Sequence, residues 1–519
     1  MNTKQRITLA CALLWGAICT AAAPAEEIVI PTDRIVSDSF VGAGVQWSAY
    51  PHADSETAEW GLLLTDEKWE ELIRRMDYLQ PRFMRVMDQA NWRYFKGLDA
   101  DGNPILDFDT QEVHALYRIL DFCQERGIVV MIGEWGVPGH RHDRNDPSIR
   151  LRDVTDSRWH RMIGAWVEHL IVTKGYSCIR YYDFINEPNG SWACTNGNFA
   201  EWAAGIQLLH KEFERRQLTG RIAICGPGSV PNASVPQYRE IWKGSLWTDY
   251  ASDAVGELLG AYNTHAYYPH RAARERSAAE YLFLDKDVAI ARREGKPFFL
   301  GEIGLKATKD GGELAAEHER RRLAKGNAST DSNMFIYDYF YGLDMASVAI
   351  QSMNSGVDAM AAWDVDDAMH TKNDLADKRD IKRWGFWNIL GTELYNDPAD
   401  EQIRPWYWAW SWLCRYLPPH SQLFVTPQPA NRGCQLLAAR VPGGYTFCAV
   451  NTSEQPVTLT LRSEGIPTLR QVHRLEDNER FAAEEHPYGQ SELKEMDLGR
   501  GYRLGGPAKT FLVLTTLPL

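Results

Sequence analysis

Short apolar stretches alternate with longer amphipathic ones from about residue 40 to 415 of this 519-residue chain. Short apolar runs bounded by turn residues are typical of buried strands, and apolar positions three or four apart are typical of helices. Strand patterns occur at 41–47, 83–87, 128–133, 181–185, 222–225, 260–265, 297–301 and 359–363. Helix patterns between them occur at 66–78, 111–125, 157–174, 199–216, 278–294 and 332–354.

Eight alternating strand and helix patterns predict a (β/α)8 barrel. The alternative is an open doubly wound sheet, but the chain has no glycine-rich phosphate loop to favour it. The stretch 404–417, after the eighth strand, carries four Trp residues spread around a helix, which indicates a packed helix and not a sugar platform.

The pattern changes near residue 418. Short strand patterns at 445–451, 457–462, 471–475 and 510–515 are separated by Pro, Gly and Asn turns, which predicts an antiparallel β-sandwich. We therefore expect a barrel in 26–417 and a β-sandwich in 418–519. Residues 26–38 either lead into the barrel or add a strand to the sandwich. The sandwich has no cluster of aromatic residues, so we expect it to be structural.

Residues 1–25 have the pattern of a signal peptide. Lys4 and Arg6 precede an apolar stretch at 7–20, and small residues up to Ala25 offer cleavage sites. The apolar stretch is short for a membrane span. We expect an exported chain, periplasmic or extracellular, without a membrane span.

Composition limits the classes of molecule that the chain is expected to bind. The formal net charge is −13, and loss of the two basic residues of the signal makes it −15. An acidic chain is a poor binder of nucleic acid and of anionic membranes, whereas neutral polysaccharide is allowed. The 19 Trp residues fit a sugar-binding protein, although most of them are expected in the core.

The cysteines suggest no cofactor. Seven lie beyond the signal, widely scattered and without the spacing of a disulfide framework or a zinc site. Cys434 and Cys448 are the one pair that a hairpin would bring together. We expect no metal, no cofactor and a monomer.

Two glutamates carry the chemistry. Glu187 follows the fourth predicted strand and Glu302 ends the seventh. The carboxyl ends of barrel strands meet at one mouth, where active sites lie. Two carboxylates facing each other across a sugar ring are the reacting groups of a glycoside hydrolase. Either acid alone would be equally well explained by an ion pair, but together they predict catalysis.

Other strand ends carry further polar and aromatic residues, and the order resembles the clan A glycoside hydrolases, most closely families 5, 30 and 39. The motifs that carry this resemblance are Asn186-Glu187-Pro188, His265-Ala266-Tyr267, Gly301-Glu302 and Trp363. They cover the barrel, about three quarters of the chain.

The resemblance implies that Glu187 is the general acid/base and Glu302 the nucleophile. It further implies that Asn186 binds the sugar 2-hydroxyl. Arg85, at the end of the second strand, would keep Glu302 ionised. The negative charge of Glu302 would in turn raise the pKa of Glu187, as a proton donor requires.

The resemblance also assigns His265 and Tyr267 to orienting the two acids, and Trp363 to the floor of the sugar site. Trp135 and Glu134 end the third strand. Glu134 departs from the commoner patterns and would either bind a sugar hydroxyl or pair with a base. Asp364, Asp366 and Asp367 would contact substrate or bind Ca²⁺, but a solvated loop is the expected interpretation.

These observations predict a secreted retaining β-glycoside hydrolase that cleaves β-linked glycans or oligosaccharides by double displacement. One alternative is a non-catalytic glycan-binding protein on a hydrolase scaffold. Another is a transglycosylase, which would use the same residues. The charged segment 306–331 is expected to close one end of the cleft, which favours exo action or short substrates. The sugar and its linkage stay open.

Overall fold

A computed structural model of the chain describes residues 25–48, 50, 60–139, 151–231, 235–243, 246–369, 381–478 and 492–519. All but the last residue of the predicted signal peptide lies outside these ranges. Within them, no helix has the length and apolar character needed to cross a membrane.

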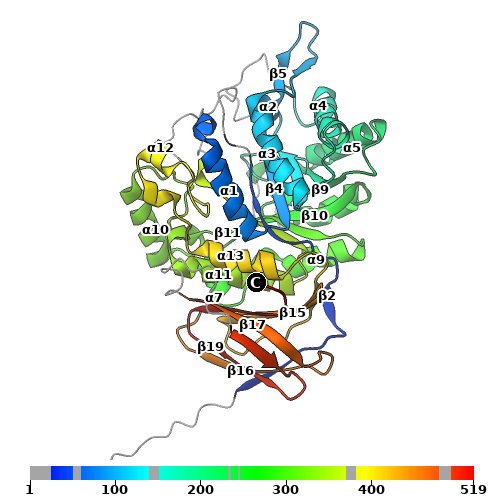
Figure 1. Ribbon diagram of the computed structural model, residues 1–519. Helices are drawn as coiled ribbons and strands as arrows, with labels where there is room; N and C mark the ends of the chain where they lie inside the picture. Colours follow the sequence, from blue (N-terminus) through cyan, green and yellow to red (C-terminus); the bar gives the residue numbers. More distant parts are fainter. Residues whose placement is uncertain are drawn as a thin grey trace, which may run out of the picture.

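Eight parallel strands form a closed barrel, which confirms the predicted (β/α)8 fold (Figure 1). Each predicted strand coincides with one of them, to within a few residues at the ends. The strands are β3 (Gly42–Gln46), β4 (Phe83–Asp88), β7 (Val129–Glu134), β8 (Ile179–Asp183), β9 (Ala223–Ser229), β10 (Leu259–Tyr268), β11 (Phe298–Leu305) and β12 (Ala359–Ala362). Their order around the barrel follows the sequence, with β12 closing on β3.

Apolar side chains from the first residues of the strands fill the amino-terminal half of the barrel interior. Phe83 and Phe299 pack there with ring centroids 5.2 Å apart, and Tyr181 packs edge-on against Phe299. Filling of this end leaves polar side chains only at the opposite, carboxyl end of the strands, where barrel chemistry takes place.

Helices surround the barrel (Figure 1). The longer ones are α1 (Asp66–Leu79), α3 (Gln111–Glu125), α4 (Ser157–Glu168), α5 (Phe199–Arg215), α6 (Trp247–Val255), α9 (Leu284–Arg293), α10 (Gly312–Lys325), α11 (Tyr339–Asn354) and α13 (Trp406–Tyr416). Short elements are α2 (Ala90–Arg93), α7 (His270–Arg274), α8 (Ala278–Leu282), α12 (Gly391–Tyr395) and the hairpin of β5 (Phe95–Leu98) and β6 (Pro104–Leu106). Side chains of Thr65, Thr110, Asp156 and Asn198 cap α1, α3, α4 and α5.

Several segments differ from the predicted helices; α6, for example, was not predicted, and α11 begins only at Tyr339. The stretch 278–294 is broken at Phe283, whose φ of 57° lies in the left-handed region. The stretch 157–174 ends in a π-helical turn from His169 to Thr173. The charged segment 306–331 contains α10, which the sequence pattern did not indicate. In α13, Trp406, Trp410 and Trp412 are buried, as expected of a packed helix.

The C-terminal strands form two sheets. The larger has the order β18-β17-β20-β15-β14-β13-β2 and the smaller β1-β16-β19. The strands are β1 (Glu26–Val29), β2 (Ile35–Ser37), β13 (Gln422–Phe424), β14 (Cys434–Val441), β15 (Gly444–Asn451), β16 (Val457–Arg462), β17 (Leu469–Asn478), β18 (Glu492–Met496), β19 (Tyr502–Gly506) and β20 (Thr510–Thr515). Two strands from the start of the chain, β1 and β2, pair with β16 and β13.

The pairing of Cys434 with Cys448 is corrected by the strand register. Cys434 lies opposite Asn451, and Cys448 lies opposite Leu437. Positions 434 and 437 are an odd number of residues apart, so their side chains point to opposite faces of the sheet. All seven cysteines of the described residues are free thiols.

The larger sheet packs directly on α11 and α13 of the barrel (Figure 1). Trp412 of α13 lies against Phe511 of β20, with ring centroids 6.0 Å apart. Tyr339 donates a hydrogen bond to the Asp477 carbonyl at 2.7 Å, and the Asn354 side-chain amide donates one to the Leu436 carbonyl at 3.0 Å. One apolar core therefore runs from the barrel helices into the sheet.

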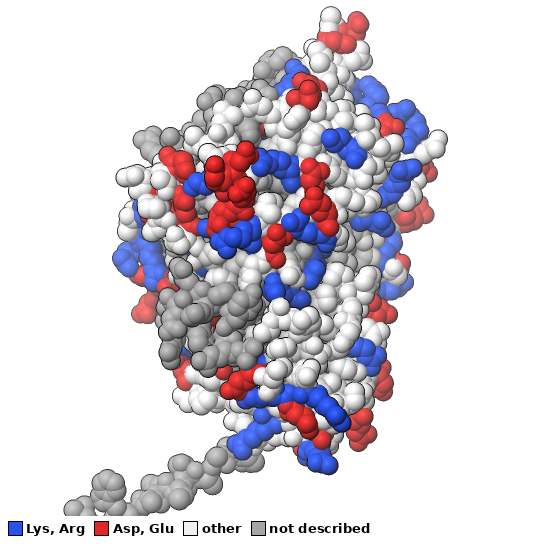
Figure 2. Space-filling model, viewed as in Figure 1, with Lys and Arg blue, Asp and Glu red and all other residues white. Residues whose placement is uncertain are grey.

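Surface charge is mixed on the face of the molecule that Figure 2 shows. Acidic and basic side chains are interspersed there, most densely over α1. Glu71 of α1, for example, pairs with both Arg74 and Arg75. Such mixing gives the described part of that face no single sign of charge, unlike the basic stripe of a nucleic-acid-binding surface.

Candidate active site

Glu187, His265 and Glu302 meet at the carboxyl ends of β8, β10 and β11. His265 lies opposite Glu302 in the strand register, directly after a shift in the β10–β11 pairing. His265 Nδ1 is 2.8 Å from Glu187 Oε1 and 3.5 Å from Glu302 Oε2. One oxygen of each carboxylate lies within 4.8 Å of the other. The two predicted acids thus share one imidazole.

Both oxygens of Glu302 are held by hydrogen-bond donors. Arg85 Nη1 donates to Oε1 at 2.6 Å, and the Tyr267 hydroxyl donates to Oε2 at 2.5 Å. The Glu302 side chain is 5% exposed. A buried carboxylate with a guanidinium on one oxygen and a hydroxyl on the other has a fixed orientation and a stabilised negative charge.

Arg85 itself is fully buried and links several strand ends. Its Nη1 also donates to Gln46 Oε1 at 2.5 Å, and its Nη2 donates to Asn186 Oδ1 at 2.7 Å. Asp183 lies 3.4 Å from Nη2 and accepts a further bond from Asn263 at 3.2 Å. Burial raises the pKa of Asp183 despite the opposing charge of Arg85. Arg85 thus holds the side-chain carbonyl oxygen of Asn186. The side-chain amide nitrogen of Asn186 has no acceptor among the described residues.

Glu187 is held differently. Its backbone has a φ of 47°, the left-handed region that residues other than glycine rarely adopt and that is enriched at functional sites. Trp192 donates its indole N–H to Glu187 Oε2 at 2.6 Å. The carboxylate is 14% exposed, more than that of Glu302.

The pKa of Glu187 departs from the expected direction. Burial raises it, but the hydrogen bond and charge of His265, the charge of Lys306 and the bond from Trp192 together lower it below its ordinary value. The expectation of a raised pKa is therefore wrong for the unliganded protein. His265, which orients Glu187, is also the main cause of the lowered pKa.

The three ligand atoms of Glu187, His265 and Glu302 are close enough to bind a metal ion. The guanidinium of Arg85, 2.6 Å from Glu302, places a fixed positive charge beside such an ion. The positive charge of Arg85 would repel a metal cation bound to Glu302, and this repulsion is strong because the site is buried. The arrangement therefore suits proton transfer better than metal binding.

An aromatic cluster borders the acids. Trp363, Tyr267 and Trp384 pack together, with Trp135 against them. The Trp135 and Trp363 rings meet edge to face at 5.9 Å, and those of Tyr267 and Trp384 at 5.7 Å. The predicted residues Trp363 and Trp135 therefore lie in one wall beside Arg85, whose guanidinium is 5.8 Å from the Trp135 ring.

The Glu134 side chain does not lie with those of Glu187, His265 and Glu302. It is buried, and its Oε1 accepts a hydrogen bond from the Tyr94 hydroxyl at 3.0 Å. Burial and the nearby charge of Asp88 raise its pKa well above the ordinary value. Glu134 therefore belongs to a buried polar group at the ends of β4 and β7, and among the described residues its carboxylate bonds neither a basic side chain nor the shared imidazole.

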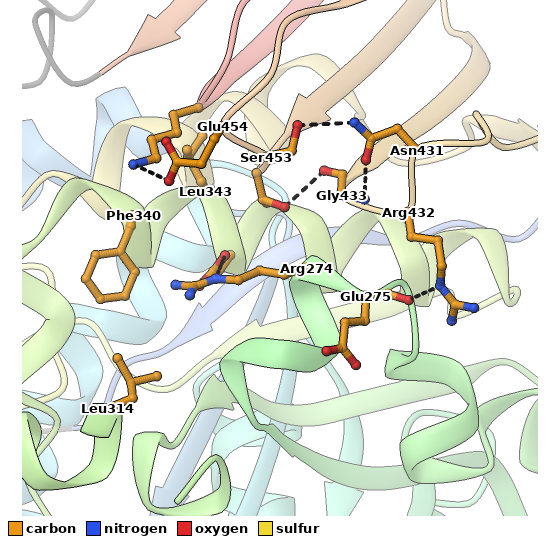
Figure 3. Close-up of a pocket in the computed structure, with 13 residues that line it drawn as sticks. Arg274, Glu275, Leu314, Phe340, Leu343, Asn431, Arg432, Gly433, Ser453 and Glu454 are labelled. Atoms are coloured by element: carbon orange, nitrogen blue, oxygen red, sulfur yellow. Dashed lines mark hydrogen bonds and ion pairs between the residues drawn. The ribbon is translucent and has the colours of Figure 1, made fainter. Parts of the chain in front are cut away.

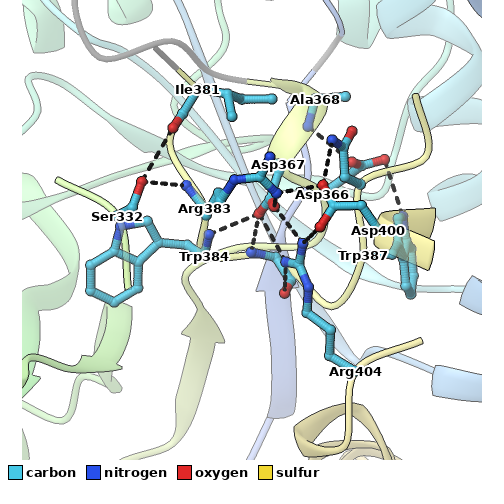
Figure 4. Close-up of polar contacts among 12 residues, drawn as sticks. Ser332, Asp366, Asp367, Ala368, Ile381, Arg383, Trp384, Trp387, Asp400 and Arg404 are labelled. Carbon is cyan, nitrogen blue, oxygen red and sulfur yellow. Dashed lines mark hydrogen bonds and ion pairs between the residues drawn. The ribbon is translucent and has the colours of Figure 1, made fainter. Parts of the chain in front are cut away.

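The acidic run after Trp363 is buried, so the expectation of a solvated loop is wrong. Asp367 pairs with Arg404 at 2.5 Å and accepts the backbone N–H of Trp384 at 2.8 Å (Figure 4). Asp366 accepts bonds from Tyr50 at 2.9 Å and Trp387 at 3.0 Å. These contacts fix the loop that carries Trp384.

Sequence reasoning missed four residues of the site. Gln46 ends the first barrel strand, so the strand-end rule was sufficient to find it. Trp192 and Lys306 follow Glu187 and Glu302 closely, but their direction depends on loop conformation. The Lys306 ammonium lies 4.5 Å from the Tyr267 ring and 5.4 Å from the Trp384 ring. Trp384 follows the eighth strand at a distance, and no local pattern marks it.

Comparison with known proteins identifies the fold. No protein-family model and no curated protein sequence matches the chain. A conserved exported protein from Bacteroides fragilis is 12% identical in sequence, with a TM-score of 0.63 over 94% of this chain and 100% of that one. The catalytic domain of the family 30 xylanase C from Talaromyces cellulolyticus is 12% identical, with a TM-score of 0.59 over 94% and 99%.

A family 39 β-xylosidase from Caulobacter crescentus is 14% identical, with a TM-score of 0.55 over 94% of this chain and 99% of that one. The chain therefore shares the fold of these structures, a (β/α)8 barrel with an attached β-sandwich, over almost its full length.

Proposed function

We propose that this protein is a secreted retaining β-glycoside hydrolase with Glu187 as general acid/base and Glu302 as nucleophile. The observation that carries the proposal is the pair of carboxylates with oxygens within 4.8 Å of each other, one held by Arg85 and the other by His265. Retaining enzymes place their carboxyl groups about 5–5.5 Å apart, whereas inverting enzymes leave about 6.5–9.5 Å for a water. Carboxylate oxygens within 4.8 Å of each other are compatible with the retaining arrangement.

In the first step, an oxygen of Glu302 attacks the anomeric carbon and forms a glycosyl ester. The bond from that carbon to the leaving oxygen breaks, and Glu187 gives its proton to this oxygen. Glu302 is suited to attack because Arg85 and Tyr267 stabilise it as a carboxylate. Glu187 is suited to proton transfer because it is the more exposed of the two acids.

In the second step, Glu187 takes a proton from a water molecule, which attacks the anomeric carbon and releases Glu302. Esterification has removed the negative charge of Glu302, so Glu187 is more readily ionised and acts as a base. A sugar hydroxyl in place of the water would make the same site a transglycosylase.

The other predicted residues have binding or orienting roles in this proposal. The side-chain amide nitrogen of Asn186, which has no acceptor in the described part of the chain, is the donor for the sugar 2-hydroxyl, because Arg85 occupies the side-chain carbonyl oxygen. Trp363 forms the floor and Trp135 the adjoining wall of the sugar site. His265 and Tyr267 are positioning residues, each holding one of the two acids.

The substrate class follows from the proposed site and from the names of similar structures. Two of these are a xylanase and a β-xylosidase. β-Linked xylan, xylo-oligosaccharides and aryl β-glycosides are therefore the first substrates to test, followed by other β-glycans.

The decisive experiment follows the first product by proton NMR before mutarotation. We expect the β-anomer, since two displacements restore the starting configuration. Glu302→Ala should lower kcat by about 10³-fold or more, because it removes the group that forms the covalent bond. Its melting temperature should stay near that of the parent chain.

Three results would contradict the proposal. An α-configured first product would indicate inversion, and near-normal turnover of Glu302→Ala would exclude Glu302 as nucleophile. Binding of β-glycans without turnover on a broad panel would instead identify a non-catalytic glycan-binding protein.

A further inference from the structure

A cavity of about 940 Å³ lies where the barrel helices meet the β-sandwich (Figure 3), and neither acid of the candidate active site lines it. Phe340 and Leu343 of α11 and Leu314 of α10 supply its apolar side chains. The β-sandwich contributes the loop before β14, with Asn431, and the loop after β15, with Ser453. Its volume is within the range of about 300–1,000 Å³ typical of small-ligand sites.

The apolar side of the cavity is rigid. The Phe340 ring packs against Phe335 and His270, with centroid distances of 5.2 and 5.4 Å. The Arg274 guanidinium lies over the same ring, 5.3 Å from its centroid, and is held by Asp344 at 2.9 Å. The aromatic ring and the planar guanidinium together form a wall against which a sugar ring can pack.

The opposite side is fixed by hydrogen bonds between the two parts of the molecule. Arg276 donates to Gln435 Oε1 and to the Asn431 and Cys434 carbonyls at 2.6–2.8 Å. Arg432 donates to the Glu275 carbonyl at 2.6 Å. The cavity is therefore preformed, and a ligand would not have to order its walls.

The charges around the cavity balance. Three basic side chains and three acidic ones line it: Arg274, Arg432, Lys509, Glu275, Asp344 and Glu454. Glu454 pairs with Lys509 at 2.8 Å, and Asp344 pairs with Arg274. No described residue hydrogen-bonds the Glu275 carboxylate, which is left as an acceptor. A cavity with no net charge, many polar groups and one aromatic wall suits a neutral ligand rich in hydroxyls.

We propose that this cavity is a second binding site for a neutral β-linked oligosaccharide, formed jointly by the barrel and the β-sandwich. The choice of a β-glycan as occupant rests on the proposed function. The Phe340 and Arg274 wall packs against the face of a sugar ring, and Glu275 accepts hydrogen bonds from its hydroxyls. Such a site holds a glycan chain on the enzyme between cleavage events without taking part in chemistry.

The test measures binding to the full chain with Glu187→Gln and Glu302→Gln, which prevents turnover. Xylohexaose and cellohexaose are titrated by calorimetry. We expect two sites per chain for one of these probes. Phe340→Ala should weaken one of them by about tenfold or more, as loss of a stacked aromatic contact predicts. Glu275→Ala should weaken the same site and leave the melting temperature unchanged, because its carboxylate has no hydrogen-bond partner in the described part of the chain.

Two matched substitutions control for nonspecific effects. Phe283→Ala removes an exposed ring elsewhere, and Glu280→Ala removes an exposed acid close in sequence. Neither should change binding. A single site, two sites that are insensitive to Phe340→Ala, or an equal effect of Phe283→Ala would overturn the inference.

The outcomes separate this inference from the proposed function. If the parent chain hydrolyses no glycan but binds at two sites, one of which is lost in Phe340→Ala, the second binding site is supported and the proposed hydrolase activity is rejected. If the parent chain hydrolyses a glycan but binds at a single site, the activity is supported and the second binding site is rejected. Concentration-dependent dimerisation that Phe340→Ala abolishes would identify a second copy as the occupant and overturn the inference.

Discussion

At the scale of single residues, His265 sets the pH response of the candidate site. Its hydrogen bond lowers the pKa of Glu187 in the unliganded protein. The profile of kcat/KM against pH reports groups of the free enzyme. Glu187 must hold a proton to act as the acid, so its lowered pKa places the basic limb of this profile at lower pH. We therefore expect maximal kcat/KM at acidic pH.

Replacing the histidine tests this assignment. In His265→Ala, Glu187 loses the contact that lowers its pKa, so the basic limb of kcat/KM should move to higher pH. The maximum should fall on the order of 10²-fold, the usual contribution of a positioned acid/base. His265→Gln keeps an N–H donor and should move the limb less. A limb that stays in place, or moves to lower pH, would reject the coupling.

The residues of the site, predicted and missed, differ in what fixes the direction of their side chains. Arg85, His265 and Glu302 lie on or at the ends of buried strands, where the fold alone points them into the barrel mouth. Trp384 depends instead on Asp367 and Arg404, which hold its loop. Contacts between residues far apart in sequence decide such positions, and no local pattern encodes them.

At the scale of elements, the barrel strands were predictable because both of their faces are buried, which makes them continuous apolar runs. Helix α10 was not, because only His318 of its residues is buried. It is supported by charge pairs one turn apart, such as Glu317 with Arg321 and Glu319 with Arg322. A helix of this kind has no apolar periodicity to detect.

Strand β17 contains a buried acid that makes stability depend on pH. Burial raises the pKa of Asp477 to about 8, and no described residue hydrogen-bonds its carboxyl group. The ordinary value of 3.8 applies in the unfolded chain. The stability contribution of this group is therefore complete below about pH 4 and is lost as pH rises towards about 8.

Asp477→Asn removes the ionisable group and should reverse this loss. We expect the variant to have a higher free energy of unfolding than the parent chain at pH 8, by on the order of 1–3 kcal/mol, and a smaller gain at pH 5. Thermal unfolding at both pH values measures this. The exposed acid of β18 provides the control, since Glu495→Gln should show no such difference. An equal gain at both pH values would contradict the argument.

At the scale of the whole molecule, the start of the chain ties the two sheets to the barrel. Ile28 and Ile30 are buried in the core between the sheets. Further along, the Ser37 hydroxyl donates to Asp358 Oδ1 at 2.5 Å, just before the last barrel strand. The larger sheet in turn shares one apolar core with α11 and α13. We therefore expect the barrel and the sandwich to unfold in one transition.

Truncation at the start of the chain tests this coupling. A chain that begins at residue 39 lacks β1 and β2, and loses the burial of Ile28 and Ile30, about 1.5–3 kcal/mol for each side chain. It also leaves an unpaired edge on β16. Compared with a chain that begins at residue 25, it should melt several degrees lower, with loss of activity and of sheet structure at the same temperature. If activity persisted above the temperature at which the sheets melt, the two parts would be independent.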